Sequence, residues 1–206
     1  MSALSFPVFP LAGALLFPRG QLPLHIFEPR YRDMIADAMA GDRLIGMVQP
    51  RDRRDPPGLF PIGGLGRIAE CERRADGRYN IVLQGLARFR ILRELAVTTR
   101  YRQVEALCQD EPGEDGVLGI AQRAELEREA RAYADALGYA VDWESVARLD
   151  DEQLVNGICQ VAPLDTGSKQ ALLEAEDLAE RADLAVQFMQ FQRMAPGGAD
   201  GPRTLQ

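Results

Sequence analysis

The sequence predicts an α+β protein in which a curled, barrel-like sheet with one inserted helix precedes a bundle of helices. Three observations indicate this. Five or six short apolar segments fill the first half of the chain, and one of them alternates in polarity as a half-buried strand does. After residue 116, apolar residues recur at helical spacing instead. The polar stretch between the two patterns, 109–116 (QDEPGEDG), is typical of a domain boundary.

Prolines indicate which structure the first apolar segments form. Residues 5–9 (SFPVF) suit an edge strand, because Pro7 lacks the N–H that a central strand must donate. Residues 22–27 (LPLHIF) alternate as a strand does, and Pro29 suits the first position of a helix over 29–40. One face of that helix is apolar, at Tyr31, Met34, Ile35, Ala38 and Met39.

Two short stretches and a loop follow the helix. Residues 44–48 (LIGMV) are too short for a helix and predict a strand. Residues 49–60 (QPRDRRDPPGLF) predict an exposed loop. Residues 61–66 (PIGGLG) lack the lysine of a phosphate-binding loop, so close backbone packing or a β-bulge is the better explanation of these glycines.

A hairpin completes the predicted sheet with one further strand. Asp76–Gly77 suits the tight turn between strands at 67–74 and 79–92. Along the second of these strands, odd positions are apolar or glycine and many even positions are polar, which predicts one buried and one wetter face. Gly85 predicts a bend in this strand, and 101–107 (YRQVEAL) predicts the last strand.

The second half predicts helices, with an unstructured end. Helices are expected at 117–137, 143–149, 151–162 and 169–194, the last in one piece or two. Small residues at steps of four and three within the last range suit close antiparallel helix packing. The tail at 196–206 is expected to be disordered.

Composition narrows the class of protein. No apolar run approaches the roughly 18 residues of a membrane helix, and no export signal is evident at the N-terminus. Three widely spaced cysteines argue for reduced thiols in the cytoplasm. The net charge of −7 divides into +4 over residues 1–110 (16 Arg against 12 acidic) and −11 over 111–206 (8 basic against 19 acidic). A charge of +4 is too small to indicate nucleic-acid binding.

The residues that could carry catalysis are too few and too scattered. His25 is the only histidine, and its place in an apolar strand favours a structural role. Ser168 and Lys169 are adjacent, so their side chains diverge on a helix and do not suit a dyad. The clustered carboxylates have no histidine or cysteine partners for a metal. The sequence therefore predicts no catalytic residues, no metal site and no cofactor.

Candidate binding residues are limited to six. Phe17 and Phe60 stand beside a proline or a loop, together with their neighbours Pro18 and Leu59, and could form an exposed apolar contact; core packing is the favoured alternative. Arg30 and Arg88 could contact a ligand. The favoured alternatives are a local ion pair of Arg30 with Glu28 and a surface or interstrand position for Arg88.

Several motifs occur together in a recognisable order. They are FPVFPL at 6–11, LFP at 16–18, LPLHIFEPRYR at 22–32, and the Asp76–Gly77 turn followed by YNIVLQGLARFRI at 79–91. This ordered set resembles the amino-terminal substrate-binding domain of the ATP-dependent protease Lon, closely over residues 5–108 and more loosely beyond. The resemblance implies a PUA-like pseudo-barrel over 1–110 followed by a helical bundle over 116–195.

The resemblance also implies a function. In Lon, an AAA+ ATPase and a Ser-Lys protease domain follow the bundle, whereas this sequence has no Walker motif and no protease serine. We therefore expect a stand-alone, non-catalytic module that binds unfolded or degron-bearing proteins, with an adaptor or regulator of proteolysis as one form of that role and a protease as a further partner. The oligomeric state stays open between monomer and dimer.

Two other functions stay open. PUA-like barrels are used for RNA, but RNA binding would need a continuous basic face with aromatic side chains for stacking, and the acidic total argues against it. A small-ligand sensor would need a concave site with converging polar groups, which the sequence does not define.

Overall fold

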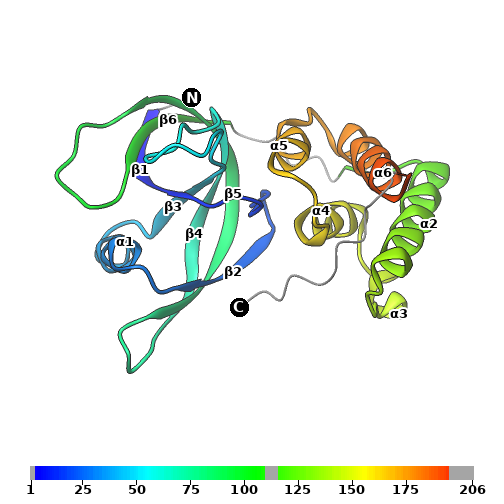
Figure 1. The fold of residues 1–206 in the computed structure, drawn as a ribbon, viewed down its shortest axis with the longest axis horizontal. Coiled ribbons are helices and arrows are strands. Elements are labelled where there is room, and N and C mark those ends of the chain that lie inside the picture. The colour runs from blue at the N-terminus through cyan, green and yellow to red at the C-terminus, as the bar shows by residue number, and fades with distance from the viewer. Residues whose placement is uncertain (1–2, 110–115, 195–206) are drawn as a thin grey trace. The chain divides into compact units, whose positions relative to one another are not determined.

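The computed structural model describes residues 3–109 and 116–194, and the chain divides into two compact units (Figure 1). The sheet unit comprises Met1–Glu114 and Pro163–Glu174, and the helical unit comprises Asp115–Ala162 and Ala175–Gln206. The predicted disordered tail at 196–206 lies outside the described residues, as does most of the predicted boundary at 109–116. The predicted α+β class is confirmed.

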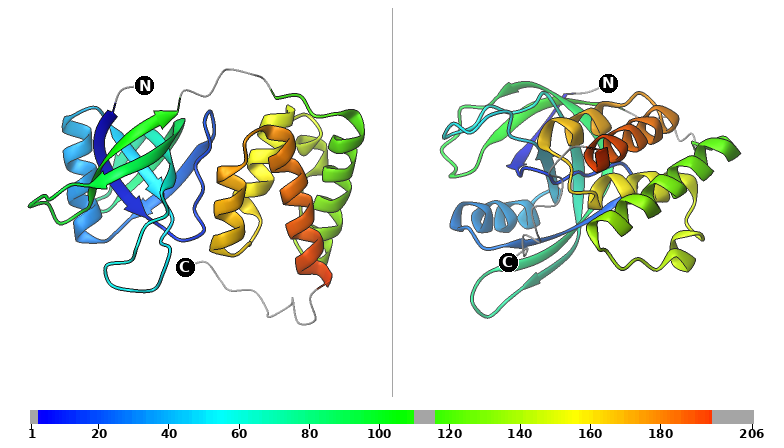
Figure 2. Two further views of the ribbon diagram at one scale, coloured as in Figure 1. Left: turned by 90° about the horizontal axis from the view of Figure 1, so that it is seen from above. Right: turned by 45° about the vertical axis from the view of Figure 1, so that its right-hand side comes forward.

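Six strands form the sheet: β1 (Ala3–Pro10), β2 (Gln21–Ile26), β3 (Leu44–Val48), β4 (Ile62–Arg73), β5 (Tyr79–Glu94) and β6 (Gln103–Gln109). Their order is β2-β5-β4-β3-β1-β6, and β5 also pairs with β6. Five strands therefore close into a barrel-like circuit, while β2 is added to the first half of β5 outside it (Figure 2). The predicted pseudo-barrel is confirmed, and β2 keeps it from being a regular barrel.

β1 is not the edge strand that Pro7 predicts. Ala3–Pro7 pair with β6 in antiparallel fashion, and Val8–Pro10 pair with β3 in parallel fashion. Pro7 is thus the last residue of one ladder, and the other ladder begins at Val8. The strand tolerates a proline at this point because it changes partner there.

Helix α1 (Pro29–Ala40) covers part of the sheet and follows β2 directly (Figures 1 and 2). Its buried residues are those that the apolar periodicity predicts, Tyr31, Met34, Ile35 and Ala38, with Met39 half-buried beside them. They pack in one cluster with side chains from the strands. The hydroxyl of Tyr101 also donates a 2.7 Å hydrogen bond to Asp37, which ties the loop before β6 to the exposed side of the helix.

Two glycines in the sheet allow the backbone of a neighbouring segment to pack directly against the strands. A Cβ at Gly64 would lie 2.0 Å from the carbonyl oxygen of Leu16, and one at Gly85 would lie 1.9 Å from that of Phe17. Contacts this short do not occur between real atoms, so both positions require glycine. The predicted close packing is confirmed for Gly64, and β4 has a register shift at Leu65/Gly66 as well. Gly85 makes room for a carbonyl group, which is a different role from the predicted bend.

A buried glutamine holds α5 (Thr166–Glu174) to the strands of its unit. Gln49 is 1% exposed; its Oε1 accepts a 2.9 Å bond from the Gly13 N–H, and its Nε2 donates to the first carbonyl of α5 at 3.3 Å. From the helix, Gln170 donates to a carbonyl at the start of β4 at 3.1 Å. These bonds place α5 in the sheet unit, whereas the sequence predicts one helical subdomain over 116–195.

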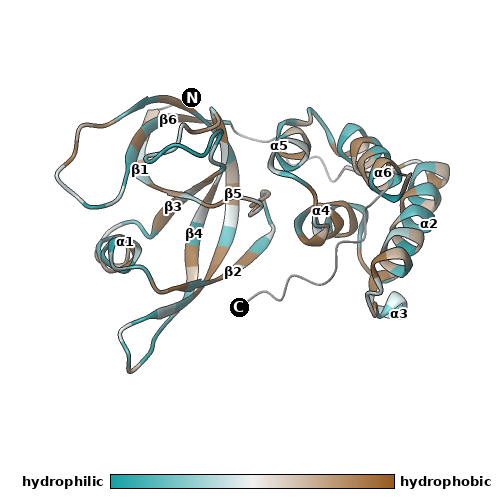
Figure 3. Cartoon of the chain, in the orientation of Figure 1, coloured by the Kyte–Doolittle hydropathy of each residue, from teal (hydrophilic) through white to brown (hydrophobic). Residues whose placement is uncertain are grey.

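The helical unit contains α2 (Ile120–Leu137), α3 (Trp143–Val146), α4 (Asp151–Val161) and α6 (Leu178–Met194). α2 and α6 pack side by side, and α4 packs on α6. Hydrophobic and hydrophilic residues both occur along these helices, as expected where each has one buried face (Figure 3). In the part of the chain that the structure describes, no helix is long and apolar enough to cross a membrane.

Polar contacts fix the start of the helical unit. The Asp151 carboxylate accepts a 2.8 Å bond from the Leu118 N–H and an ion-paired hydrogen bond from Arg123. These bonds and the positive charge of Arg123 lower the pKa of Asp151 below its ordinary value. α4 begins with a capping box, in which Asp150 and Gln153 satisfy each other's backbone N–H groups.

Candidate functional site

A groove of about 640 Å³ runs across β2, β5 and β4. It is open to solvent and takes residues from all three strands, where the first half of β5 lies between its two neighbours (Figure 1). Its lining mixes apolar and hydrogen-bonding groups: Pro23, Leu24, His25, Glu70, Cys71, Glu72, Asn80, Ile81 and Val82. A concave surface of this mixed kind is the default candidate for ligand binding.

The groove is built from cross-strand rows. Residues that face each other in paired strands point to the same side of the sheet, so the register sets which groups meet. One row is His25, Asn80 and Glu72, and the next is Pro23, Val82 and Glu70. A register shift in β4 between Ile68 and Glu70 brings Glu70 opposite Val82. An apolar row therefore lies beside a hydrogen-bonding row, each with a carboxylate on β4.

The hydrogen-bonding row forms a continuous chain. His25 Nδ1 lies 2.8 Å from Asn80 Oδ1, and Asn80 Nδ2 donates to Glu72 Oε2 at 3.1 Å. A carboxylate accepts only, so Glu72 fixes which end of the amide faces it and leaves the carbonyl end for His25. The bonding pattern thus assigns the proton to Nδ1 and leaves Nε2 of the exposed imidazole to meet a ligand.

The groups that line the groove are suited to binding. Burial raises the pKa of the Cys71 thiol, more than the charge of Arg43 lowers it, which disfavours the nucleophilic thiolate form. Among residues 3–109 and 116–194, no group of three or more histidine, cysteine, aspartate or glutamate side chains could hold a metal ion. What the groove offers is an apolar floor, two carboxylates and one imidazole.

The two ends of the groove differ in the side chains that border them. At one end, Gln84 on β5 meets Gln21 on β2 at 3.3 Å and also donates to the carbonyl of Arg19 at 2.8 Å. At the other end, Phe27 is 59% exposed and stacks beside His25, with ring centroids 6.3 Å apart. Beyond Phe27 lie the first turn of α1 and the turn that joins β4 to β5.

The residues predicted as binding contacts do not line this groove. Phe17 and Pro18 are buried, which agrees with the core packing weighed against an exposed contact. Leu59 and Phe60 are half-buried, and Leu59 packs against an apolar cluster of the barrel.

The two predicted arginines also have local roles. Arg30 pairs with Glu28 at 2.9 Å and lies over the ring of Tyr31, the local ion pair expected as the alternative. Glu28 provides no side-chain cap to α1; its carbonyl accepts the first helical bond instead. Arg88 donates to the carbonyl of Leu173 at 3.3 Å, near the end of α5.

Sequence reasoning missed the groove because its residues come from three separate segments. The sequence nevertheless contains two indications of the groove. The even positions of 79–91 predict a wetter face, and His25 is the only histidine of the sequence. What the sequence does not state is the register that sets His25 opposite Asn80 and Asn80 opposite Glu72.

Residues 5–190 match the family described as the ATP-dependent protease La (LON) substrate-binding domain. The chain is 31% identical to Lon protease 2 of Myxococcus xanthus over 196 residues, which cover 91% of this chain and 24% of that protein. It is 29% identical to the Lon protease of Anaeromyxobacter dehalogenans, covering 91% of this chain and 23% of that protein. The chain therefore spans about a quarter of the length of these curated relatives.

Solved structures show the same fold. A Lon N-terminal domain protein from Xanthomonas campestris superposes with a TM-score of 0.65 at 23% identity, covering 94% of this chain and 99% of that one. The N-terminal domain of a Mycobacterium avium complex Lon protease also gives a TM-score of 0.65, at 20% identity, covering 91% and 98%.

Proposed function

Because the chain belongs to the family of Lon substrate-binding domains, we propose that it is a recognition module that binds exposed segments of other proteins in the groove across β2, β5 and β4. The observation that carries this proposal is the pair of rows in the groove. Pro23 and Val82 give an apolar floor, and the row of His25, Asn80 and Glu72 gives hydrogen-bonding groups next to it.

An extended protein segment suits this arrangement. Its side chains alternate from one side to the other, so apolar residues can face Val82 while backbone or polar groups reach His25 and Glu72. Such segments are exposed in unfolded proteins and buried in folded ones, which gives the module a way to discriminate between them. The ligand class is therefore unfolded proteins, with degradation signals of suitable sequence as a special case.

The setting of this binding is part of the proposal. Adaptor or regulator activity in proteolysis would follow if the bound segment were handed to a protease, and the relatives' names as Lon proteases support that context. The module itself would contribute binding and no peptide-bond chemistry. A cytoplasmic location, predicted from the three cysteines, belongs to the same proposal.

The test uses the full chain and a permanently unfolded, alkylated globular protein carrying a fluorophore. Binding is followed by anisotropy, with the native form of the same protein as the competitor. Val82→Asp places a charge in the apolar floor of the groove. Leu92→Asp, at an exposed position of the same strand, is the matched control.

We expect the unfolded form to bind, the native form not to compete, and Val82→Asp to abolish binding while Leu92→Asp does not. Both variants must first show the unfolding midpoint of the parent within a small margin. Equal loss of binding in the two variants, or equal binding of the native form, would overturn the proposal.

A further inference from the structure

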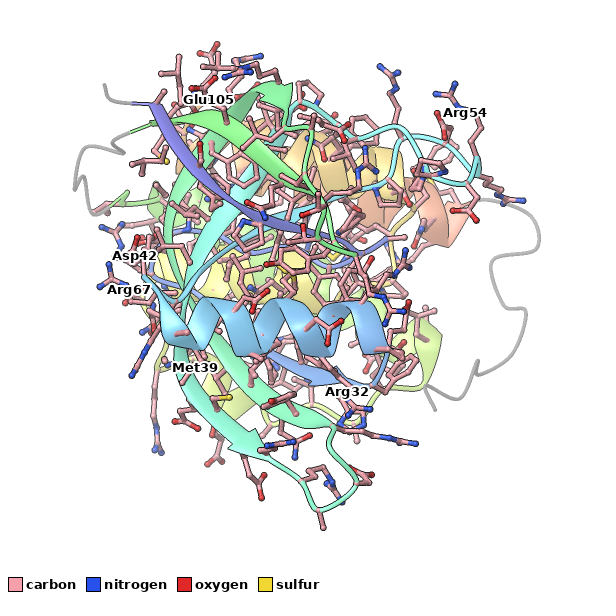
Figure 4. All side chains as sticks on the ribbon, turned by 90° about the vertical axis from the view of Figure 1, so that its left-hand side faces the viewer. Arg32, Met39, Asp42, Arg54, Arg67 and Glu105 are labelled. Carbon is pink, nitrogen blue, oxygen red and sulfur yellow. The ribbon has the colours of Figure 1, made fainter. Side chains whose placement is uncertain are left out.

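Arginines gather where α1 meets the turn between β4 and β5. Arg73, Arg74 and Arg78 belong to this hairpin tip, and Arg32 reaches it from the first half of α1 (Figure 4). We call these four residues the arginine tip. An ideal Cβ on Gly77, at the turn, would lie 2.5 Å from Nη2 and 3.2 Å from Cζ of Arg32, so that guanidinium lies directly against the turn.

One nitrogen of the Arg32 guanidinium, Nε, lacks the hydrogen-bond acceptor that such a group normally finds in a folded protein. Its Nε is buried from solvent, and no hydrogen-bond acceptor meets it within the described chain. A buried donor without an acceptor is unfavourable, so such a group usually signals a missing partner. The Arg32 guanidinium therefore has hydrogen-bonding capacity that the described chain does not use.

The carboxylates near the arginine tip do not neutralise it. Asp76 accepts a 3.1 Å bond from the Arg78 N–H and pairs with its side chain at 3.4 Å, and the positive charges of Arg78 and Arg74 help to lower the pKa of Asp76. Arg73 and Arg74 make no ion pair with any residue in 3–109 or 116–194. The turn itself thus has one carboxylate, Asp76, beside the arginines of the tip, and Glu72 lies one cross-strand pair further along the ladder.

The arginine tip also lies at one end of the groove. Asn80 and Glu72 face each other in the ladder, and the next pair toward the turn on the same side is Arg78 and Arg74, joined by the bond from the Arg74 N–H to the Arg78 carbonyl. A chain that follows the groove past His25 and Phe27 therefore arrives at guanidinium groups.

We propose that the arginine tip is an anion site that binds the carboxylates of a protein segment whose neighbouring residues occupy the groove. This rests on the proposed function and specifies its ligand: apolar, extended segments followed by aspartate or glutamate. Planar guanidinium groups suit carboxylates because the two form parallel hydrogen bonds.

The charges of the groove favour a protein segment over a nucleic acid. Glu70 and Glu72 line the groove next to the arginine tip and would repel a phosphate backbone at each step. A polypeptide can place neutral residues opposite these carboxylates and keep its acidic residues for the tip. We therefore assign the site to an acidic protein segment and use RNA as a competitor in the test.

The test measures binding of two labelled peptides of one length to the full chain. Both carry the same alternating valine–threonine segment, followed by aspartates in one and by asparagines in the other. The variant Arg74→Gln/Arg78→Gln removes two charges from the arginine tip. Arg53→Gln/Arg90→Gln removes two charges from exposed positions elsewhere on the sheet unit and is the matched control.

We expect the aspartate peptide to bind about five- to tenfold more tightly than the asparagine peptide, and this advantage to disappear in the tip variant and to persist in the control. If the asparagine peptide binds and aspartate gives no advantage, the anion site is refuted and the groove stands. If neither peptide binds, the proposed function fails too. Tighter binding of a single-stranded RNA than of the aspartate peptide would overturn the assignment to protein.

Arg32→Met separates ligand binding from a structural role. The substitution keeps an apolar stem against the turn and removes the buried Nε that lacks an acceptor. We expect an unchanged or higher melting temperature together with about threefold weaker binding of the aspartate peptide. A lower melting temperature with unchanged affinity would show that Arg32 is structural.

Discussion

The imidazole of His25 on β2 and the amide of Asn80 on β5 face each other across the ladder, with Nδ1 2.8 Å from Oδ1. Because Asn80 also donates to Glu72 at 3.1 Å, its amide is held from both sides and orients the imidazole. The three side chains thus act as one hydrogen-bonded unit that spans the three strands of the groove, and changing the middle one should disturb both neighbours.

Asn80→Asp tests this unit. The new carboxylate would directly oppose Glu72 in the ladder and could no longer donate to it. Like charges directly opposite in a sheet are unfavourable, and we expect a loss of about 0.5–1 kcal/mol in the free energy of unfolding at neutral pH. Urea denaturation measures it. Adding Glu72→Gln to the same variant should recover most of the loss, and no recovery would contradict the proposed pairing.

The second prediction concerns the effect on stability of replacing a glycine that another backbone segment contacts closely. Gly85→Ala would force a methyl group to within 1.9 Å of the Phe17 carbonyl oxygen, so the segment over the sheet must move. We expect a loss of about 2–3 kcal/mol, the upper part of the range for overpacking.

The matched substitution is Gly157→Ala in α4. A Cβ at Gly157 meets nothing within 4 Å, and the position lies inside a helix. We expect a gain of about 0.5–1 kcal/mol, because alanine is the better helix former. Thermal unfolding of the two variants should shift in opposite directions, and equal shifts would show that space above Gly85 is not the reason for its glycine.

Local patterns predicted much of this fold because they depend on neighbours in sequence. The apolar face of α1 follows from the spacing of Tyr31, Met34 and Ile35, and Gly77 has the positive φ of 79° that the Asp-Gly turn requires. Asp142, which directly precedes α3, accepts bonds from the N–H groups of Glu144 and Ser145 in the first turn of that helix. Each of these features is decided within one or two turns of chain.

Long-range partners could not be predicted in the same way. Nothing in the periodicity of 166–174 says that this helix belongs with the strands, since Gln49 and Gln170 are polar residues whose bonds join distant segments. The rows of the groove depend on strand register, including a shift in β4 that no local motif marks. The sequence pattern identified the right face of β5 and left its partners undefined.

Gln49 gives a third prediction. Gln49→Leu would leave the Gly13 N–H and the first carbonyl of α5 without their buried partners. We expect a loss of about 2–3 kcal/mol, since unsatisfied buried groups bear the full cost of desolvation. Gln103→Leu is the control, because Gln103 is half-buried and bonds Thr99 at 3.3 Å.

Hydrogen exchange distinguishes this prediction from general destabilisation. If Gln49 holds α5 to the sheet unit, amides of 166–174 should lose protection in Gln49→Leu before those of the central strands do. Uniform loss of protection across the unit would show that Gln49 stabilises the whole core and not this attachment.

Asp151 predicts how stability depends on pH. Hydrogen bonds from Arg123 and from the Leu118 N–H lower its pKa below the ordinary 3.8, so the folded state binds the proton less readily than the unfolded state does. The stabilisation is therefore fully present above about pH 4 to 5 and is lost as pH falls through the lowered pKa of the folded state.

We expect Asp151→Asn to reduce stability at neutral pH by about 1–3 kcal/mol, as for loss of a charged hydrogen bond. The gap between parent and variant should then narrow as pH falls below 4, because the parent loses the same interaction by protonation. Urea denaturation of both proteins across this pH range measures the gap, and a gap that stays constant would show that Asp151 does not stabilise the fold through its charge.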